Sequence, residues 1–557
     1  MKKTELGKQR LYLLWVLTLI GLWGCGNNTQ KESVGASSRE KLDWLILSPR
    51  IVSPDTDSIR IYTAMGIRDG LIIALGNEEA LRDQYIVGQI LETRNPIYPG
   101  FIDAHCHFWG LAETQMQVQL TGCRSWSEVI SRCRDYAQEH QGLTRITGRG
   151  WDETLWPEGD TSSLTELSQA FPDIPVFIRR VDGHAALVNQ KALELGGITQ
   201  QSSIAGGKIV LHRGLLIDNA MTPIREKIPQ MGIQQMAVGL SKASEQCLQW
   251  GITTVADAGL PPHQIAILDS MQQAGHIPQR IYAMLSYSPQ NLEYAQQKGP
   301  QKTDFLRVHS FKFFADGALG SQGAKLKEPY CGKEVHRGLL LMEPQALKGA
   351  LEEVSQLGFQ AHTHCIGDSA NRMVLDLYHT VLQGQTDRRW RIEHAQVLDT
   401  ADMRLFNNPN IIPSIQPIHA ISDMGWAEKR LCSHRMPGAY AYASLLHHAK
   451  TVAIGTDFPV EDPSTIANFY AAIARKNTEH KPREGFLQDQ KLSRSDALRG
   501  MTLWAAHSLF MEPLIGSFQV GKKADFIELS QDLLLSSEES IPQTQVLKVF
   551  IDGKPMN

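Results

Sequence analysis

Eight compact apolar runs, all beyond residue 97, constrain the fold of this chain more than any other feature of its sequence. In order they are GFIDAHCHF, GITTVADAG, RIYAMLSYS, VHSFKFFADG, FQAHTHCIGD, WRIEHAQV, NIIPSIQPIHA and TVAIGTDFPV. Helical patterns separate several of them, most clearly at residues 343–359, where Pro344 suits a first helical turn and Leu347 and Leu351 share one face. Buried strands that alternate with helices indicate a parallel α/β sheet, and eight of them favour a TIM-like (β/α)8 barrel over an open sheet.

The sequence outside these runs predicts two further parts. Residues 41–97 and 511–557 hold short β-rich runs broken by Pro, Asp and Gly, so we expect both ends of the chain to form one small β-sandwich domain. The barrel then occupies residues 98–510. Its first two strands are about 140 residues apart, far more than an ordinary βα connection, which predicts an inserted subdomain at about residues 110–240, after barrel strand 1.

The N-terminus predicts export. Basic residues precede the apolar run LYLLWVLTLIGLW, which is too short to span a bilayer comfortably and is typical of a signal peptide over residues 1–24. The run ends in LWGC and resembles a bacterial lipobox, which makes Cys25 the predicted lipidation site; an ordinary signal peptide with a chance cysteine is the alternative. Residues 25–40 are polar and predict a flexible tether. We therefore expect a lipoprotein held at a membrane by its N-terminal lipid, on the periplasmic or outer-membrane side.

Composition limits the class of partner. The 557 residues are 42% apolar and 20% charged, as in globular proteins, and the formal net charge of −4 gives no sign of a basic face that would bind nucleic acid. We expect a small-molecule substrate, and a homo-oligomer is compatible with the sequence. Seven cysteines besides Cys25 show no paired spacing, so no disulfide framework is predicted, although an exported protein could form one or two bridges.

The ends of the apolar runs carry residue types that bind metals. His105 and His107 are two residues apart, so on a strand they would point together into the barrel mouth while Cys106 points away. Such a pair alone has an equally good structural explanation, because histidines often end strands for hydrogen-bonding reasons. Barrel enzymes, however, place catalytic groups at the carboxyl ends of their strands, and four later runs supply further metal-binding types there. These are Lys312, His364, His394 and Asp457.

With these residues in place, the sequence resembles the amidohydrolase superfamily, and within it the amidohydrolase family 3 branch, which is called YtcJ-like and includes relatives of N-substituted formamide deformylase. The resemblance covers nearly all of residues 41–553 and implies a metal-dependent hydrolase barrel. The stretches that carry it are PGFIDAHCH, GRGWDETLWPEG, PDIPVFIRRVDGHAALVN, FKFFADGALGSQGAKLKEPY, HCIGD, RIEHAQ, SIQPIHA and GTDFPVEDP.

The resemblance implies a set of metal ligands for one or two ions, with Zn²⁺ expected and another divalent metal as the alternative. It also implies that the amine of Lys312 is carboxylated and bridges two metals, which agrees with chemistry, since an ammonium would repel a dication and a carbamate offers two oxygens. His362 shares a face with His364, but His364 fits the motif. The implied ligands are His105, His107, Lys312, His364, His394 and Asp457.

The implied reaction is hydrolysis of a C–N bond in a small non-peptide amide, such as an N-acyl or N-formyl compound. A metal-activated water would attack the carbonyl, with Asp457 as the general base that passes the proton to the leaving nitrogen. His184 resembles a substrate-facing histidine that could polarise the carbonyl, although it could instead structure the insert. Trp151, Asp152 and Gln416 resemble substrate-pocket positions, and Trp151 could equally belong to the core of the insert.

Two other functions remain open at this point. Deamination of a heterocycle occurs in the same superfamily with similar ligands, and its product, ammonia, would distinguish it. A surface lipoprotein that binds a ligand without catalysis belongs to a different class. That function would be indicated by the loss of a ligand or of Asp457, and the sequence retains them all.

Overall fold

A computed structural model describes residues 39–140, 142–153, 156–180, 185–204, 207–228 and 231–556. The predicted signal peptide, Cys25 and most of the predicted tether lie outside the described residues, and so does His184. The chain divides at residue 40, and the second unit, Lys41–Asn557, is compact and contains three sheets. Among the helices of the described ranges, none has both the length and the apolar character needed to cross a bilayer.

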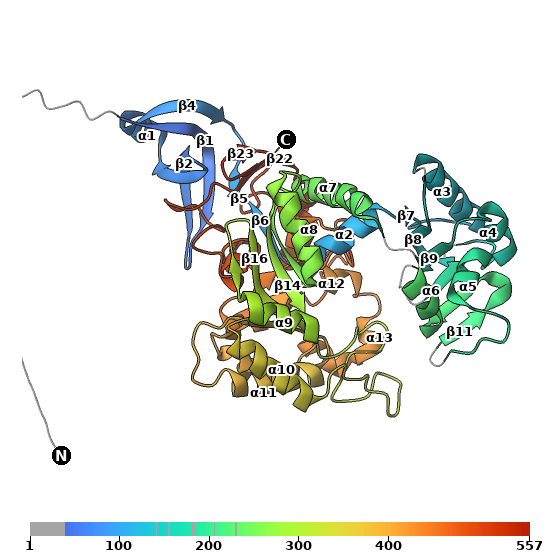
Figure 1. Cartoon of the computed structure of the whole chain (residues 1–557). Helices are drawn as coiled ribbons and strands as arrows, with labels where there is room; N and C mark the ends of the chain where they lie inside the picture. The colour runs from blue at the N-terminus through green and yellow to red at the C-terminus, as the bar shows by residue number, and fades with distance from the viewer. Residues whose placement is uncertain are drawn as a thin grey trace, which may run out of the picture. The chain divides into compact units, whose positions relative to one another are not determined.

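The predicted barrel is present as eight parallel strands (Figure 1). Each strand overlaps one of the eight apolar runs, which confirms the prediction of a TIM-like barrel. The barrel is nearly closed, because the backbone N–H of Asp457, just after the last strand, donates to the carbonyl of His105 in the first at 2.8 Å. In sheet order the strands are β20 (Ala453–Ile454), β19 (Ile411–Ile415), β18 (Trp390–His394), β17 (Gln360–Cys365), β16 (Leu306–Phe314), β14 (Arg280–Ser286), β13 (Ile252–Leu260) and β6 (Phe101–Cys106), with the short β15 (Gln301–Lys302) antiparallel to β16.

Helices surround the barrel strands, which explains why the strands are apolar along their whole length. All residues of β6, β18 and β19 are buried. The helix expected at residues 343–359 is α10 (Pro344–Gln356), and it buries Leu347 and Leu351 as predicted. The other helices are α2 (Phe108–Gln115), α7 (Ile233–Gln249), α8 (Pro262–Gln273), α9 (Pro289–Lys298), α11 (Asp368–Val381), α12 (Pro417–Ser422), α13 (Ala427–Leu431), α14 (Tyr442–Ala449), α15 (Thr465–Ala474), α16 (Arg494–Gly500) and α17 (Leu503–Ser508).

The two ends of the second unit join in one sheet. Its centre is β5 (Ile97–Pro99), which is parallel to β1 and antiparallel to β21. A buried ion pair links this sheet to the barrel, since Arg280 of β14 donates from Nε to Asp525 Oδ2 at 2.6 Å. The division into two layers that a sandwich requires stays a prediction. The remaining elements are β1 (Glu40–Pro54), β2 (Ile59–Arg68), β3 (Leu71–Gly76), α1 (Glu78–Gln84), β4 (Tyr85–Glu92), β21 (Phe526–Leu529), β22 (Val546–Ile551) and β23 (Lys554–Pro555).

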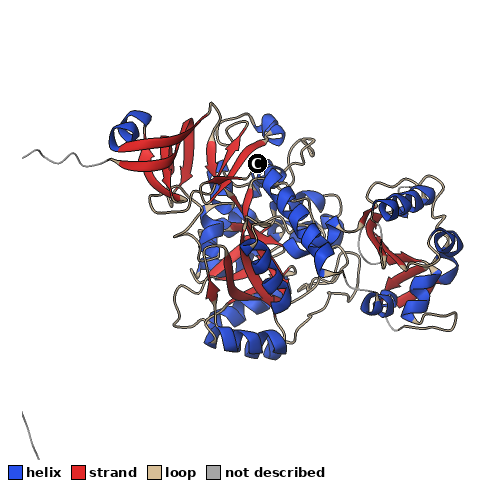
Figure 2. Cartoon of the chain, turned by 45° about the horizontal axis from the view of Figure 1, so that its top comes forward, coloured by secondary structure: helices blue, strands red, loops and turns tan. Residues whose placement is uncertain are grey.

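The long segment between barrel strands 1 and 2 contains a third sheet with its own apolar cores. Its strands β7, β8 and β9 are parallel, and the others are antiparallel. Figure 2 shows these strands in red with blue helices beside them. In sheet order they are β11 (Gly207–Val210), β12 (Leu215–Asp218), β10 (Ala185–Val188), β9 (Val176–Arg180), β8 (Ile146–Trp151) and β7 (Val118–Gln119), and the helices are α3 (Trp126–Glu139), α4 (Leu164–Ala170), α5 (Gln190–Gly196) and α6 (Thr222–Lys227).

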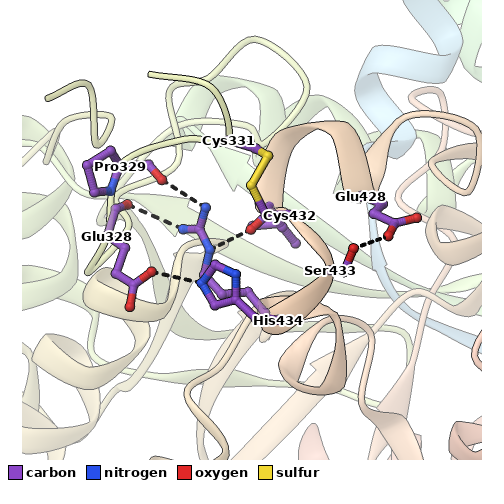
Figure 3. The surroundings of a disulfide bond; sticks show 9 residues. Glu328, Pro329, Cys331, Glu428, Cys432, Ser433 and His434 are labelled. Atoms are coloured by element: carbon purple, nitrogen blue, oxygen red, sulfur yellow. Dashed lines mark hydrogen bonds and ion pairs between the residues drawn. A yellow bond between two sulfur atoms is a disulfide. The ribbon is translucent and has the colours of Figure 1, made fainter. Parts of the chain in front are cut away.

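A disulfide joins two loops that follow the carboxyl ends of barrel strands (Figure 3). Cys331 lies between β16 and α10, and Cys432 follows α13, 101 residues later. Polar contacts support the link, since Arg435 donates to the carbonyl of Pro329 at 2.8 Å and His434 lies 2.9 Å from Glu328. The five other described cysteines are free and buried. The pair is thus one of the bridges that the composition allowed without identifying its members.

Candidate metal centre

Three of the predicted ligands converge where the last barrel strand meets the first. Asp457 follows β20, and its Oδ1 lies 3.2 Å from His107 Nε2 and 3.6 Å from His105 Nε2. The donor atoms of these three residues are close enough together to hold one metal ion. Asp457 has a φ of +63°, and His394 has +70°. Residues with a Cβ seldom adopt such values, and when they do they are often found at functional positions.

Lys312 lies beside this group. Its Nζ is 3.1 Å from His105 Nε2, and the side chain is 1% exposed. Burial lowers the pKa of Lys312 to about 8, because the interior disfavours the charged form. The amine is therefore much closer to its neutral, nucleophilic form at physiological pH than a surface lysine is.

His364 and His394 complete the cluster. The ring of His394 is centred 4.9 Å from that of His105 and 4.6 Å from that of His364. Burial lowers the pKa of His105 to about 4 and that of His364 to about 3. These imidazoles are therefore neutral at pH 7, which is the form that binds a metal.

The donor set fits a divalent metal. Three buried atoms in the cluster, His364 Nε2, His419 Nε2 and Asp457 Oδ1, have no hydrogen-bond partner. Buried polar atoms nearly always have one, so these three atoms have unused capacity as ligands. Imidazole nitrogens together with a carboxylate suit Zn²⁺ and similar ions.

His419 is a site residue that the sequence analysis did not single out. Its Nε2 lies 3.5 Å from Asp457 Oδ2, and it forms a second potential metal-binding group with His394 and Asp457. It is the third residue of α12, which begins two residues after β19 ends. It therefore lies on a helix and not at a strand end, and its position within SIQPIHA is the signal that the sequence offers.

Neighbouring groups set the orientation of the histidines. Glu393 accepts a short hydrogen bond from His105 Nδ1 and a second, of 2.6 Å, from Arg391 Nε, so Nε2 of His105 faces the cluster. Burial would raise the pKa of Glu393, but the charge of Arg391 and the hydrogen bonds with His105 and Arg391 hold it well below its usual range. Nδ1 of His107 lies 3.0 Å from the carbonyl of Ala258. Outer partners of this kind fix the tautomer that leaves the other nitrogen available to a metal.

The predicted substrate-pocket residues lie in different places. Gln416 is at the centre, with Oε1 2.8 Å from Nδ1 of His394. Trp151 is 1% exposed, donates from its indole to the carbonyl of Ile178 at 2.9 Å and belongs to an apolar core of the insert. This position fits the alternative that Trp151 is a core residue. Asp152 forms an ion pair with Arg180 at 3.3 Å.

His362 packs behind the predicted ligands' neighbour Glu393, with Nδ1 3.7 Å from its Oε1. It is fully buried, with Nδ1 3.2 Å from Met284 Sδ and its ring stacked on Tyr282. The choice of His364 over His362 as the ligand stays a prediction.

A cavity of about 310 Å³ opens beside His107. It is lined by Trp109 and Asp257 from the barrel, by Pro459 after β20, and by Arg149 and Arg179 from the insert. A second space of about 840 Å³, open to solvent, shares Arg149 and Pro459 with it. A small molecule could thus reach the metal centre between the barrel and the insert.

An eight-stranded parallel barrel with histidines and an aspartate gathered at the carboxyl ends of its strands defines a metal-dependent hydrolase. The chain belongs to the amidohydrolase family, whose model matches residues 97–556. This confirms the resemblance to amidohydrolase family 3.

Similar proteins span almost the whole chain. It is 29% identical to Protein LONG AFTER FAR-RED 3 of Arabidopsis thaliana, over 92% of this chain and 91% of that protein. It is 26% identical to the putative amidohydrolase YtcJ of Bacillus subtilis (88% and 95%), and 23% identical to the N-substituted formamide deformylase of Arthrobacter pascens (92% and 97%). A solved structure of an uncharacterized metal-dependent hydrolase from Pyrococcus horikoshii superimposes with a TM-score of 0.77 at 25% identity, over 89% of this chain and 99% of that one.

Proposed function

We propose that this protein hydrolyses a C–N bond, other than a peptide bond, in a small N-acyl or N-formyl amide. The observation that carries the proposal is the cluster of histidines around Asp457, with unused ligand atoms, beside a cavity of small-molecule size. The similarity to an N-substituted formamide deformylase supports amide hydrolysis as the chemistry.

The ligand set in this proposal is the one that the sequence predicted, with Zn²⁺ as the expected metal. When bound, the metal would lower the pKa of a coordinated water and so supply a nucleophile at neutral pH. Lys312, 3.1 Å from His105, would bridge two ions as a carbamate. The protein ligands are His105, His107, Lys312, His364, His394 and Asp457, and His419 is placed to join them.

Asp457 is the proposed general base. Although burial opposes it, the contact of 3.2 Å with Nε2 of His107 holds the pKa of Asp457 well below its usual range, so the carboxylate is ionised. It would take the proton from the attacking water and deliver it to the leaving nitrogen. His184, outside the described residues, is proposed to polarise the substrate carbonyl.

The test combines metal analysis with a substrate screen. We expect the purified protein to contain one to two equivalents of zinc or a similar metal, and to hydrolyse members of a panel of N-acyl, N-formyl and cyclic amides. Asp457→Asn should keep metal but lose about 100- to 10,000-fold in turnover. Asp399→Asn, at a surface ion pair with Lys327, is the matched control and should stay active. Full activity of Asp457→Asn would refute the role of this residue, and release of ammonia would favour deamination.

The protein is also proposed to be an exported lipoprotein, attached to a membrane through Cys25. The N-terminal sequence supports this, and so does the disulfide between Cys331 and Cys432. Disulfides persist in oxidising compartments such as the periplasm and are rare in the cytosol.

A further inference from the structure

Two arginines lie side by side at the cavity next to the metal centre. In the parallel pairing of β8 with β9, Arg149 is directly opposite Arg179. Residues opposite each other on neighbouring strands project from the same face of a sheet, so the two side chains share one face. Both line the cavity of about 310 Å³ that also contains His107. This cavity is therefore lined by one proposed metal ligand, His107, and by a pair of guanidinium groups.

Further arginines line a cavity next to this pair. This neighbouring cavity of about 180 Å³ shares Glu113, Gln117 and Arg179 with the cavity beside His107. Arg145 and Arg225 line this neighbouring cavity as well. Among the described residues, the acidic groups that line the two cavities are Glu113 and Asp257. Both already accept hydrogen bonds from Trp109, Glu113 from the indole at 3.2 Å and Asp257 from the backbone N–H at 2.9 Å.

The guanidinium group of Arg179 has no hydrogen-bond or ion-pair partner among the described residues. Burial and the nearby charge of Arg149 lower the pKa of Arg179, and the charge of Glu113 offsets this only in part. Like charges opposite each other on a sheet are destabilising, and a partly buried cation without a partner adds to that cost. An anion in the cavity would relieve both.

We propose that Arg179, together with Arg149, binds a carboxylate group of the substrate, so that this enzyme prefers amides that carry a free carboxylate. The inference rests on the proposed amide hydrolysis and adds that the substrate carries a negative charge. A guanidinium group can donate two parallel hydrogen bonds to a carboxylate, and arginine is therefore the usual residue for binding this group. Because His107 and Arg179 line one small cavity, the scissile bond and the carboxylate belong to the same small molecule.

The experiment compares pairs of substrates that differ only in this group. N-acetyl and N-formyl derivatives of glycine, leucine and phenylalanine are each supplied as the free acid and as the carboxamide. We expect wild-type protein to have the higher kcat/KM on the acids. Arg179→Gln should lower kcat/KM on the acids by about 10- to 100-fold, mainly through KM, and leave the carboxamides within about 2-fold. Arg179→Lys should recover part of the preference, since it restores the charge without the planar fork.

Arg134→Gln is the matched control. Arg134 lies exposed on α3 of the same insert, so the substitution removes the same charge at a distance from the cavities. It should leave the ratio of acid to carboxamide unchanged. An equal loss in Arg134→Gln and Arg179→Gln would mean that overall charge, and not this cavity, sets the preference, and would overturn the inference.

A binding measurement separates this inference from the proposed function. Calorimetry on the full chain with Asp457→Asn, with and without Arg179→Gln, measures the dissociation constants of the same acids and carboxamides without turnover. If wild-type protein hydrolyses none of them but the acids bind better and depend on Arg179, amide hydrolysis fails and the carboxylate site stands. If acids and carboxamides bind equally, or neither binds, the carboxylate site is refuted even where hydrolysis is observed.

Discussion

His105 depends for its orientation on Glu393, which lies within RIEHAQ but was not predicted as a site residue. The carboxylate is buried between His105 and Arg391, so it holds the ring with Nε2 directed at the other ligands. We predict that Glu393→Gln weakens metal binding by about 10- to 100-fold, as loss of an outer partner of a metal ligand does. Competition with a chelator would measure the affinity. Glu352→Gln, at an exposed site on α10, is the control, and equal affinities in the two variants would contradict the prediction.

His309 makes stability depend on pH. It lies on β16, is 7% exposed, and burial lowers its pKa to about 4 from 6.5. Between these values the unfolded chain takes up a proton that the folded chain does not, so stability present above pH 6.5 is lost as the pH falls towards 4. His309 should contribute a loss of roughly 1 to 3 kcal/mol. Denaturant unfolding at pH 7 and pH 5 measures how much unfolding free energy is lost between these two values. This loss should be smaller in His309→Gln than in wild type, and identical losses would argue against the role of His309.

At the scale of elements, the barrel strands could be predicted because burial on both faces leaves a continuous apolar run, as in β6 and β19. The strands of the insert could not, since they are short and of mixed polarity. Strand register is also beyond a single sequence, so nothing indicated that Arg149 lies opposite Arg179. At the metal centre, the positions of His105, His107 and Asp457 at the ends of apolar runs made them predictable as ligands. The roles of His419 and Glu393 depend on tertiary contacts, which no spacing in the sequence specifies.

The two loops joined by the disulfide are expected to depend on it for stability. The bond closes a segment of 101 residues, and such a link restricts the unfolded chain. Replacing Cys331 and Cys432 together by serine should lower the free energy of unfolding by about 2 to 4 kcal/mol. Urea unfolding of this double variant should match that of wild-type protein kept under reductant. A wild-type midpoint that does not respond to reductant would contradict the prediction.

For the whole molecule, we propose that the N-terminal sequence attaches the protein to a membrane. Cys25→Ala should remove the lipid attachment and move the protein from the membrane fraction to the soluble fraction. Fractionation of cells with detection of the protein by antibody measures this, with labelling by a radioactive fatty acid as a second readout. Ser33→Ala, in the tether, is the control. Membrane association that persists in Cys25→Ala would show that attachment has another cause.

The position of β5 has a consequence for biosynthesis. This strand immediately precedes the barrel, yet one of its two neighbours is β21, which lies more than 400 residues later in the chain. A ribosome makes β5 early and β21 near the end, so the sheet around β5 stays incomplete until translation is nearly finished. A nascent chain in this state keeps one edge of β5 unpaired next to the segment that carries His105 and His107. Such a delay would suit the proposed export, in which the precursor passes through a translocation channel before it folds.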